Sequence, residues 1–273
     1  MVRRIAKHLV AGAAALGFFI PLVPNAQAAQ CNPQGGFTMF IAEFSAEARR
    51  QGISQRTIDH ALSGVIPNPA VLRLDRNQQH FKVSFEKFVA QRVTAARLSK
   101  AGKMLRQHAT LFDSIEARFG VAREVIVAIW AMETDFGTNT GNMSSIRSLA
   151  TLAHDCRRTQ LFQGELMAAL MILERGDMSA DQMRGAWAGE LGQTQFLASN
   201  YLRLAVDFDG DRRRDLIRSV PDALASTANY LKAYGWQRGG NWQPGSANFE
   251  VIKQWNKSEN YARAIALFAD KLT

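Results

Sequence analysis

The residues best suited to acid–base chemistry lie at the end of one apolar segment. The run from Val125 to Met132 (VIVAIWAM) is followed directly by Glu133. A carboxyl group packed beside such a run loses hydration, and desolvation raises its pKa. A glutamate that stays protonated near neutral pH can act as a general acid. The alternative interpretation of Glu133 is a buried structural ion pair.

A second segment, from Gly185 to Phe196 (GAWAGELGQTQF), combines glycines, amides and aromatic residues. Glycine lets a backbone approach a ligand closely. Glutamine side chains both donate and accept hydrogen bonds, which suits sugar hydroxyls, and the Trp and Phe rings offer faces to sugar rings. The segment therefore predicts a carbohydrate site, with a tight helix-packing loop as the alternative.

Several other chemistries are excluded by motifs that the chain lacks. It has no P-loop, no dinucleotide-binding glycine fingerprint, no HExxH, no CxxC pair and no GxSxG. The five histidines are scattered singly, so each is expected in the core or on the surface rather than as a metal ligand.

Helices must position these residues, because alternating strand patterns are nearly absent. Ser54 is expected to cap a helix that ends at Leu62, and Gly120 to end another. The helix that Gly120 ends spans residues 105–119, and the other expected helices span 40–51, 83–98, 124–134, 161–175, 220–234 and 261–272. The predicted class is mostly α, with a smaller helical N-terminal lobe.

The composition is that of a folded protein. The 273 residues are 47% hydrophobic and 21% charged, which excludes a disordered tail, and 20 glycines with 7 prolines exclude a collagen-like chain. The formal net charge is +9. A basic chain binds an anionic partner, whose nature depends on the compartment.

The first residues predict an export signal, residues 1–28, with cleavage after Ala28. Three basic residues precede an apolar run, and Ala26-Gln27-Ala28 supplies the small residues of a cleavage site. Cleavage lowers the formal charge to +6. We therefore expect a periplasmic protein that binds an anionic envelope polymer or a membrane surface, and no nucleic acid. A short membrane anchor is the alternative, and Gln30 before Cys31 argues against lipoprotein anchoring.

Export also permits a disulfide bond between the only two cysteines, Cys31 and Cys156. Such a bond would close a long loop and stabilise the fold by roughly 4–5 kcal/mol. Two separate thiols remain the alternative, because spacing alone gives no distance.

The segment Ala128 to Gly137 (AIWAMETDFG) resembles the catalytic segment of the lytic murein transglycosylase B family, which has a lysozyme-like catalytic core. The similarity continues, in the same order, over nearly all of the chain that follows the export signal. The other segments that carry it are 74–78, 147–153, 157–158, 189–196, 207–215 and 229–236.

The resemblance implies one catalytic domain over residues 29–273, with an N-terminal lobe at 29–104 and a lysozyme-like core at 105–273. Members cleave the β-1,4 bond between N-acetylmuramic acid (MurNAc) and N-acetylglucosamine (GlcNAc) of peptidoglycan and form a 1,6-anhydro sugar without water. Glu133 matches the single acid/base. The residues expected to bind glycan or stem peptide are Gln195, Phe196, Tyr230, Asn256, Tyr261, Arg157 and Arg158.

A single-carboxylate mechanism needs no second acid, whereas ordinary glycosidases use two. Asp135 and Glu190 are therefore expected to be structural or rim charges. Two alternative functions remain open: a muramidase that admits water, and a non-catalytic peptidoglycan-binding protein. The expected partners are glycan strands, stem peptides and other cell-wall enzymes, and the expected state is a monomer.

The resemblance requires no cofactor, although some relatives bind calcium in an EF-hand-like loop. The matching positions here are Asp207, Asp209, Asp211 and Asp215. Arg212 stands where such a loop has its glycine, and Arg218 where it has its last acid. Calcium binding thus competes with a solvated acidic turn neutralised by neighbouring arginines.

Overall fold

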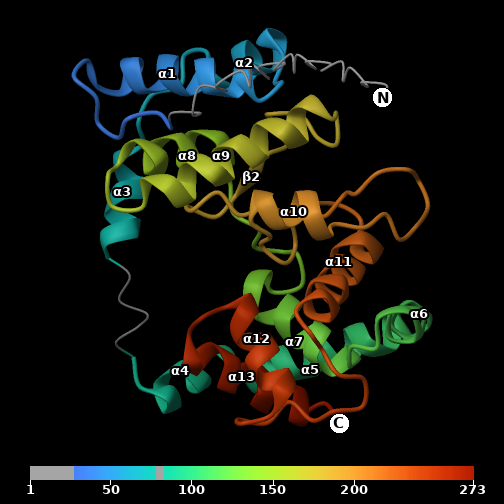
Figure 1. Ribbon diagram of the computed structural model, residues 1–273. Coiled ribbons are helices and arrows are strands. Elements are labelled where there is room, and N and C mark those ends of the chain that lie inside the picture. The colour runs from blue at the N-terminus through green and yellow to red at the C-terminus, as the bar shows by residue number, and fades with distance from the viewer. Residues whose placement is uncertain (1–27, 78–82) are drawn as a thin grey trace, which may run out of the picture.

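The computed structural model describes residues 28–77 and 83–273, and the predicted mostly α class is confirmed over them (Figure 1). The export signal lies outside the described residues, apart from Ala28. One group of helices forms the upper half of Figure 1: α1 Gly36–Arg50, α2 Gln55–Leu62, α3 Pro69–Arg76, α8 Ser145–His154, α9 Thr159–Glu174 and α10 Ala198–Leu204. In this group α9 packs against α2, α8 and α10.

The remaining helices form the lower half and surround the one that carries Glu133. They are α4 Phe85–Arg92, α5 Ala95–Gln107, α6 Ala109–Phe119, α7 Arg123–Thr134, α11 Val220–Ala233, α12 Ala247–Trp255 and α13 Glu259–Asp270. The central α7 packs against α5, α6, α11 and α13, so every residue from Val125 to Met132 is buried. An apolar surface on all sides of a helix requires this central position.

A small sheet of two short strands lies next to α8, with α8 and α9 between the strands in the chain. β1 (Met143–Ser144) pairs antiparallel with β2 (Arg184–Gly185), with Met143 opposite Gly185. A Cβ on Gly185 would lie 1.7 Å from the carbonyl oxygen of Glu190, so only glycine fits there. Gly185 and Gly192 thus let backbone pack on backbone, against the carbonyl groups of Glu190 and Leu216, whereas Gly189 makes room for the Leu149 side chain of α8.

Helix caps account for most of the boundaries. The Ser54 and Ser219 side chains each accept a hydrogen bond from the backbone N–H three residues later, as N-caps do. Gly120 ends α6 in the left-handed conformation, as predicted.

One predicted helix is wrong. The interval 83–98 holds two helices, because Val93 leaves the helical conformation and the Thr94 side chain caps α5 by accepting from Arg97 N–H. The helix expected at 105–119 likewise starts only at Ala109, because α5 continues to Gln107. The predicted lobe boundary at 104/105 falls inside α5, and the division into lobes stays a prediction.

Candidate active site

Glu133 lies in the last turn of α7, where two other helices reach it. Both contacts go to the same carboxylate oxygen, Oε1: the Tyr261 hydroxyl donates to it at 2.6 Å and the Trp255 indole Nε1–H at 3.0 Å. Trp255 ends α12 and Tyr261 lies in the first turn of α13, which packs on α7. Glu133 itself is half-buried. The side chain is therefore held by neutral donors rather than by the ion pair of the alternative interpretation.

The pKa of Glu133 is raised above its ordinary value. Burial is the main cause, and the negative charge of Glu190 acts in the same direction. The hydrogen bonds from Tyr261 and Trp255 and the charge of Arg92 oppose the shift without cancelling it. Such a carboxyl group carries a proton at a pH where an ordinary glutamate is ionised, which is the property expected of a general acid.

The segment 185–196 is fastened to α7 by an amide that the sequence reasoning missed. Gln193 accepts from Trp130 Nε1–H at 3.1 Å through its side chain, and its backbone carbonyl accepts from the Thr134 hydroxyl at 2.5 Å. Gln195 is half-buried, and its amide N–H donates to the carbonyls of Gly192 at 2.8 Å and Thr140 at 3.1 Å. These bonds leave the Gln195 amide oxygen available, and its predicted sugar contact stays a prediction.

An aromatic cluster forms one wall beside Glu133. Trp255 packs edge-on against Phe196 and Tyr230, with ring centroids 5.3 Å and 4.8 Å away, and Tyr230 stacks on Tyr234 at 4.4 Å. Phe196 is only 1% exposed, so it offers no free face to a sugar, contrary to its predicted role. Because it lies beneath Trp255 and Tyr230, it supports the wall instead.

Two further predicted residues connect or position this wall. The Tyr230 hydroxyl donates to the carbonyl of Gln254 at 2.7 Å, directly before Trp255. Asn256 accepts from Ser258 N–H at 3.0 Å, and Ser258 caps α13, so Asn256 shapes the turn that sets Trp255 relative to Tyr261. The six-residue spacing of Trp255 and Tyr261 matches no known motif, so the sequence does not predict that both side chains contact Glu133.

The two nearby carboxylates have different environments. Asp135 ends α7 in a left-handed conformation and pairs with Lys100 at 3.1 Å and Arg97 at 3.5 Å. Burial opposes the shift, but these cations lower the pKa of Asp135. Glu190 accepts from Ala188 N–H at 3.1 Å, and burial raises its pKa. Asp135 is thus a structural charge, as predicted, whereas Glu190 remains a candidate second acid.

The arginine pair lies on the connection between α8 and α9, where it holds Asp75 of α3. Arg157 Nε donates to Asp75 Oδ2 at 2.8 Å, Arg158 pairs with Oδ1, and Asp75 is 2% exposed. Both guanidinium groups remain partly exposed. A contact with a stem peptide stays a prediction, and fastening α3 to the connection is a role that the sequence reasoning missed.

We expect Asp75→Asn to lower the free energy of unfolding by about 2 kcal/mol, below the cost of a fully buried pair because the arginines are partly hydrated. Burial raises the pKa of Asp75, but the two arginines lower it below 3.8 overall. The loss should be present above pH 4 and vanish as the pH falls through that lowered pKa.

Urea unfolding at several pH values measures the effect of Asp75→Asn. Asp155→Asn is the matched control, because Asp155 pairs with the exposed Arg76, at 2.8 Å. It should cost less than about 1 kcal/mol. Equal losses in the two variants would contradict the proposed importance of Asp75.

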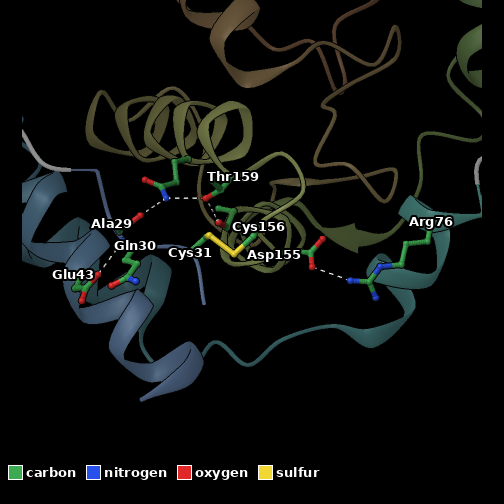
Figure 2. The surroundings of a disulfide bond; sticks show 10 residues. Ala29, Gln30, Cys31, Glu43, Arg76, Asp155, Cys156 and Thr159 are labelled. Carbon is green, nitrogen blue, oxygen red and sulfur yellow. Dashed lines mark hydrogen bonds and ion pairs between the residues drawn. A yellow bond between two sulfur atoms is a disulfide. The ribbon is translucent and has the colours of Figure 1, made fainter. Parts of the chain in front are cut away.

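The predicted disulfide bond is confirmed, and Figure 2 shows its surroundings. Cys31 and Cys156 are bonded across 125 residues, with their Cα atoms 5.1 Å apart. Gln163 donates to the carbonyl of Ala29, two residues before Cys31, at 2.7 Å. The N-terminal segment is therefore fixed to the same connection that carries the arginine pair.

The aspartate loop presents three carboxylates to one point. Ligand atoms of Asp207, Asp209 and Asp211 lie within 4.8 Å of one another, whereas Asp215 accepts from the backbone of Ile217 and Arg218. Arg212 adopts a φ of 70°, the conformation that glycine usually supplies. These carboxylates fit a divalent cation in part. Three acidic side chains could serve as ligands, but Arg218 stands where an EF-hand loop has its final acidic ligand.

Residues 36–246 match the family described as the transglycosylase SLT domain. The chain is 39% identical to membrane-bound lytic murein transglycosylase B of Escherichia coli (strain K12) over an aligned stretch of 122 residues. This stretch is 44% of this chain and 34% of that protein. The alignment thus spans about a third of the length of this curated relative.

Solved structures agree with this match. SltB3 from Pseudomonas aeruginosa in complex with NAG-NAM-pentapeptide superposes with a TM-score of 0.82 at 35% identity, covering 86% of this chain and 79% of that one. Slt35 of Escherichia coli in complex with calcium gives a TM-score of 0.76 at 25% identity, covering 85% and 92%. The chain belongs to the transglycosylase SLT domain family, a family with lytic murein transglycosylases among its members.

Proposed function

We propose that this chain is a lytic transglycosylase that cleaves the MurNAc-β-1,4-GlcNAc bond of peptidoglycan and leaves a 1,6-anhydro-MurNAc end. The observation that carries the proposal is the half-buried Glu133 carboxyl, with its raised pKa and two neutral donors on one oxygen. The relative SltB3 supports the product class, since it also has a structure in complex with NAG-anhNAM-pentapeptide, with a TM-score of 0.81 to this chain.

Glu133 supplies both proton transfers of this reaction. The protonated carboxyl group gives its proton to the glycosidic oxygen as the bond from that oxygen to C1 of MurNAc breaks. The resulting carboxylate takes the proton of the C6 hydroxyl while the hydroxyl oxygen bonds to C1. The acid is restored, no water is consumed, and one group acts first as acid and then as base.

A hydrolytic muramidase is the second candidate, and Glu190 is the observation that favours it. Glu190 lies close enough for its charge to raise the pKa of Glu133, so a second carboxylate is present to activate water. Mass spectrometry of digested peptidoglycan separates the two functions. We expect MurNAc ends one water lighter than hydrolytic ends, and exclusively hydrolytic ends would contradict the proposal. Binding to insoluble peptidoglycan without released sugar would indicate the non-catalytic alternative.

The remaining parts of the proposal concern location and partners. We place the chain in the periplasm as a monomer, exported by a signal that ends at Ala28. Stem-peptide carboxylates are the expected ligands of Arg157 and Arg158, and other cell-wall enzymes are expected partners. No helix among the described residues has the length and apolarity needed to cross a membrane.

We expect cleavage to require no cofactor, because both proton transfers are assigned to one carboxyl group. Activity measured after exhaustive EDTA treatment should stay within about twofold of the untreated activity. If the aspartate loop binds calcium, the metal should raise the melting temperature without changing the product. Loss of turnover in EDTA, restored by calcium, would contradict a cofactor-free reaction.

A further inference from the structure

Trp255 joins the Glu133 carboxyl group to the aromatic wall. Its indole N–H donates to Glu133 Oε1, while its ring packs on Phe196 and Tyr230. The Tyr230 hydroxyl holds the backbone directly before it, at Gln254. The indole is thus fixed by packing and by a backbone bond, and its N–H direction is set independently of any substrate.

The two carboxyl oxygens of Glu133 differ in their hydrogen bonding, because both donors contact the same one. Oε1 accepts from both Trp255 and Tyr261, so its lone pairs are occupied. In the neutral acid the proton then resides on the other oxygen, Oε2, because a protonated Oε1 would lose one of these bonds. No hydrogen bond to Oε2 occurs within residues 28–77 and 83–273. Oε2 is therefore the oxygen available to a substrate.

We propose that Trp255 is a positioning residue that holds Oε1 of Glu133 and thereby makes Oε2 the atom that gives and reclaims the proton. The inference rests on the proposed function. Tyr261 alone would leave the carboxyl group free to rotate about its single bond, and the second donor, from a different helix, fixes the plane. Because the carboxyl plane is fixed before the substrate binds, the carboxyl group need not reorient during the reaction, which lowers the activation barrier of the proton transfer.

The charges around Glu133 determine how its pKa responds to the loss of the indole. Tyr261 faces it from α13, Glu190 from the segment before α10 and Arg92 from α4. Lys100 and Arg97 of α5 are engaged by Asp135. Since a donated hydrogen bond favours the ionised form, removing the indole N–H raises the pKa of Glu133 further.

The test is Trp255→Phe, which keeps an aromatic ring in the wall and removes only the donor and part of the ring. A hydrogen bond to a charged group corresponds to roughly ten- to hundredfold in rate, so kcat should fall by that factor. KM should change by less than about twofold, since the bond does not touch the substrate. The pH–rate profile should move to higher pH.

Trp242→Phe is the matched control. Trp242 donates the same kind of bond, Nε1–H to a carboxylate, but to Asp270 at 2.9 Å, a contact made by α13 on its solvent side. This variant should keep the kcat and the pH profile of the unmodified chain. A circular dichroism melt of both variants checks that any lost rate does not come from unfolding.

A second measurement does not depend on turnover. A ¹³C-NMR titration of the Glu133 carboxyl group should give a higher midpoint in Trp255→Phe than in the unmodified chain or in Trp242→Phe. An unchanged midpoint, or an unchanged kcat in a chain that forms anhydro ends, overturns the role of Trp255. Absence of anhydro ends from the unmodified chain contradicts the proposed function instead, and the titration still tests the indole contact.

Discussion

Glu133→Gln should reduce the formation of anhydro ends by roughly two to four orders of magnitude, the contribution expected of a positioned proton donor. Glutamine has nearly the same shape, and its amide oxygen can accept from both Trp255 and Tyr261 in place of Oε1. The amide N–H₂ then occupies the place of Oε2, where it cannot release a proton to a glycosidic oxygen. The chemistry is lost while the contacts that hold the side chain remain.

The fold should survive this change. Burial penalises the charged form of Glu133, and a neutral amide avoids that penalty. The melting temperature of Glu133→Gln should therefore equal or exceed that of the unmodified chain at pH 7. Turnover is measured by the release of anhydro-muropeptides from purified peptidoglycan.

Two other glutamates sharpen this experiment. Glu250→Gln, on the exposed side of α12 where it pairs with Lys253, should leave turnover unchanged. Glu190→Gln should lose much less than Glu133→Gln if one carboxyl group performs both transfers. Full turnover by Glu133→Gln would contradict its role, and equal losses at both positions would favour the two-carboxylate muramidase.

The parts of the fold that follow from local rules could be predicted from the sequence. The buried helix α7, the Ser54 and Ser219 caps and the end at Gly120 all depend on residues within a few positions of each other. The break between α4 and α5 escaped the same reasoning. Apolar spacing continues across it, because α4 packs against α13 and α5 packs against α7. Thr94 is also a weaker signal of a break than a glycine or proline.

The chemistry of the site could be predicted only in part, because only some of it depends on residues that are close together in the sequence. Glu133 stands out because its own helix desolvates it, which is a local property of the sequence. Its two hydrogen-bond donors, Trp255 and Tyr261, lie 122 and 128 residues further along the chain. No local sequence pattern around these two residues indicates that they contact Glu133. The sequence does not single out Gln193, whose bonds to Trp130 and Thr134 hold the segment 185–196 against α7.

Removing the disulfide bond should lower the free energy of unfolding by about 5 kcal/mol, because the bond closes a loop of 125 residues in the unfolded chain. The corresponding fall in melting temperature is roughly 10–20 °C for a chain of this size. The double variant Cys31→Ser with Cys156→Ser avoids a free thiol that could form other bonds. Urea unfolding of the oxidised chain and of this variant measures the difference.

The loss of stability should be greatest in the elements next to the disulfide bond. Cys156 immediately precedes Arg157 and Arg158, and Cys31 follows the backbone that Gln163 holds at Ala29. Hydrogen exchange should therefore rise first in α1 and in the α8–α9 connection, while α7 and α13 stay protected. Turnover on peptidoglycan should persist below the new melting temperature, because Glu133, Trp255 and Tyr261 lie in the other group of helices. A variant as stable as the oxidised chain, or one that exchanges fastest around α7, would contradict this assignment.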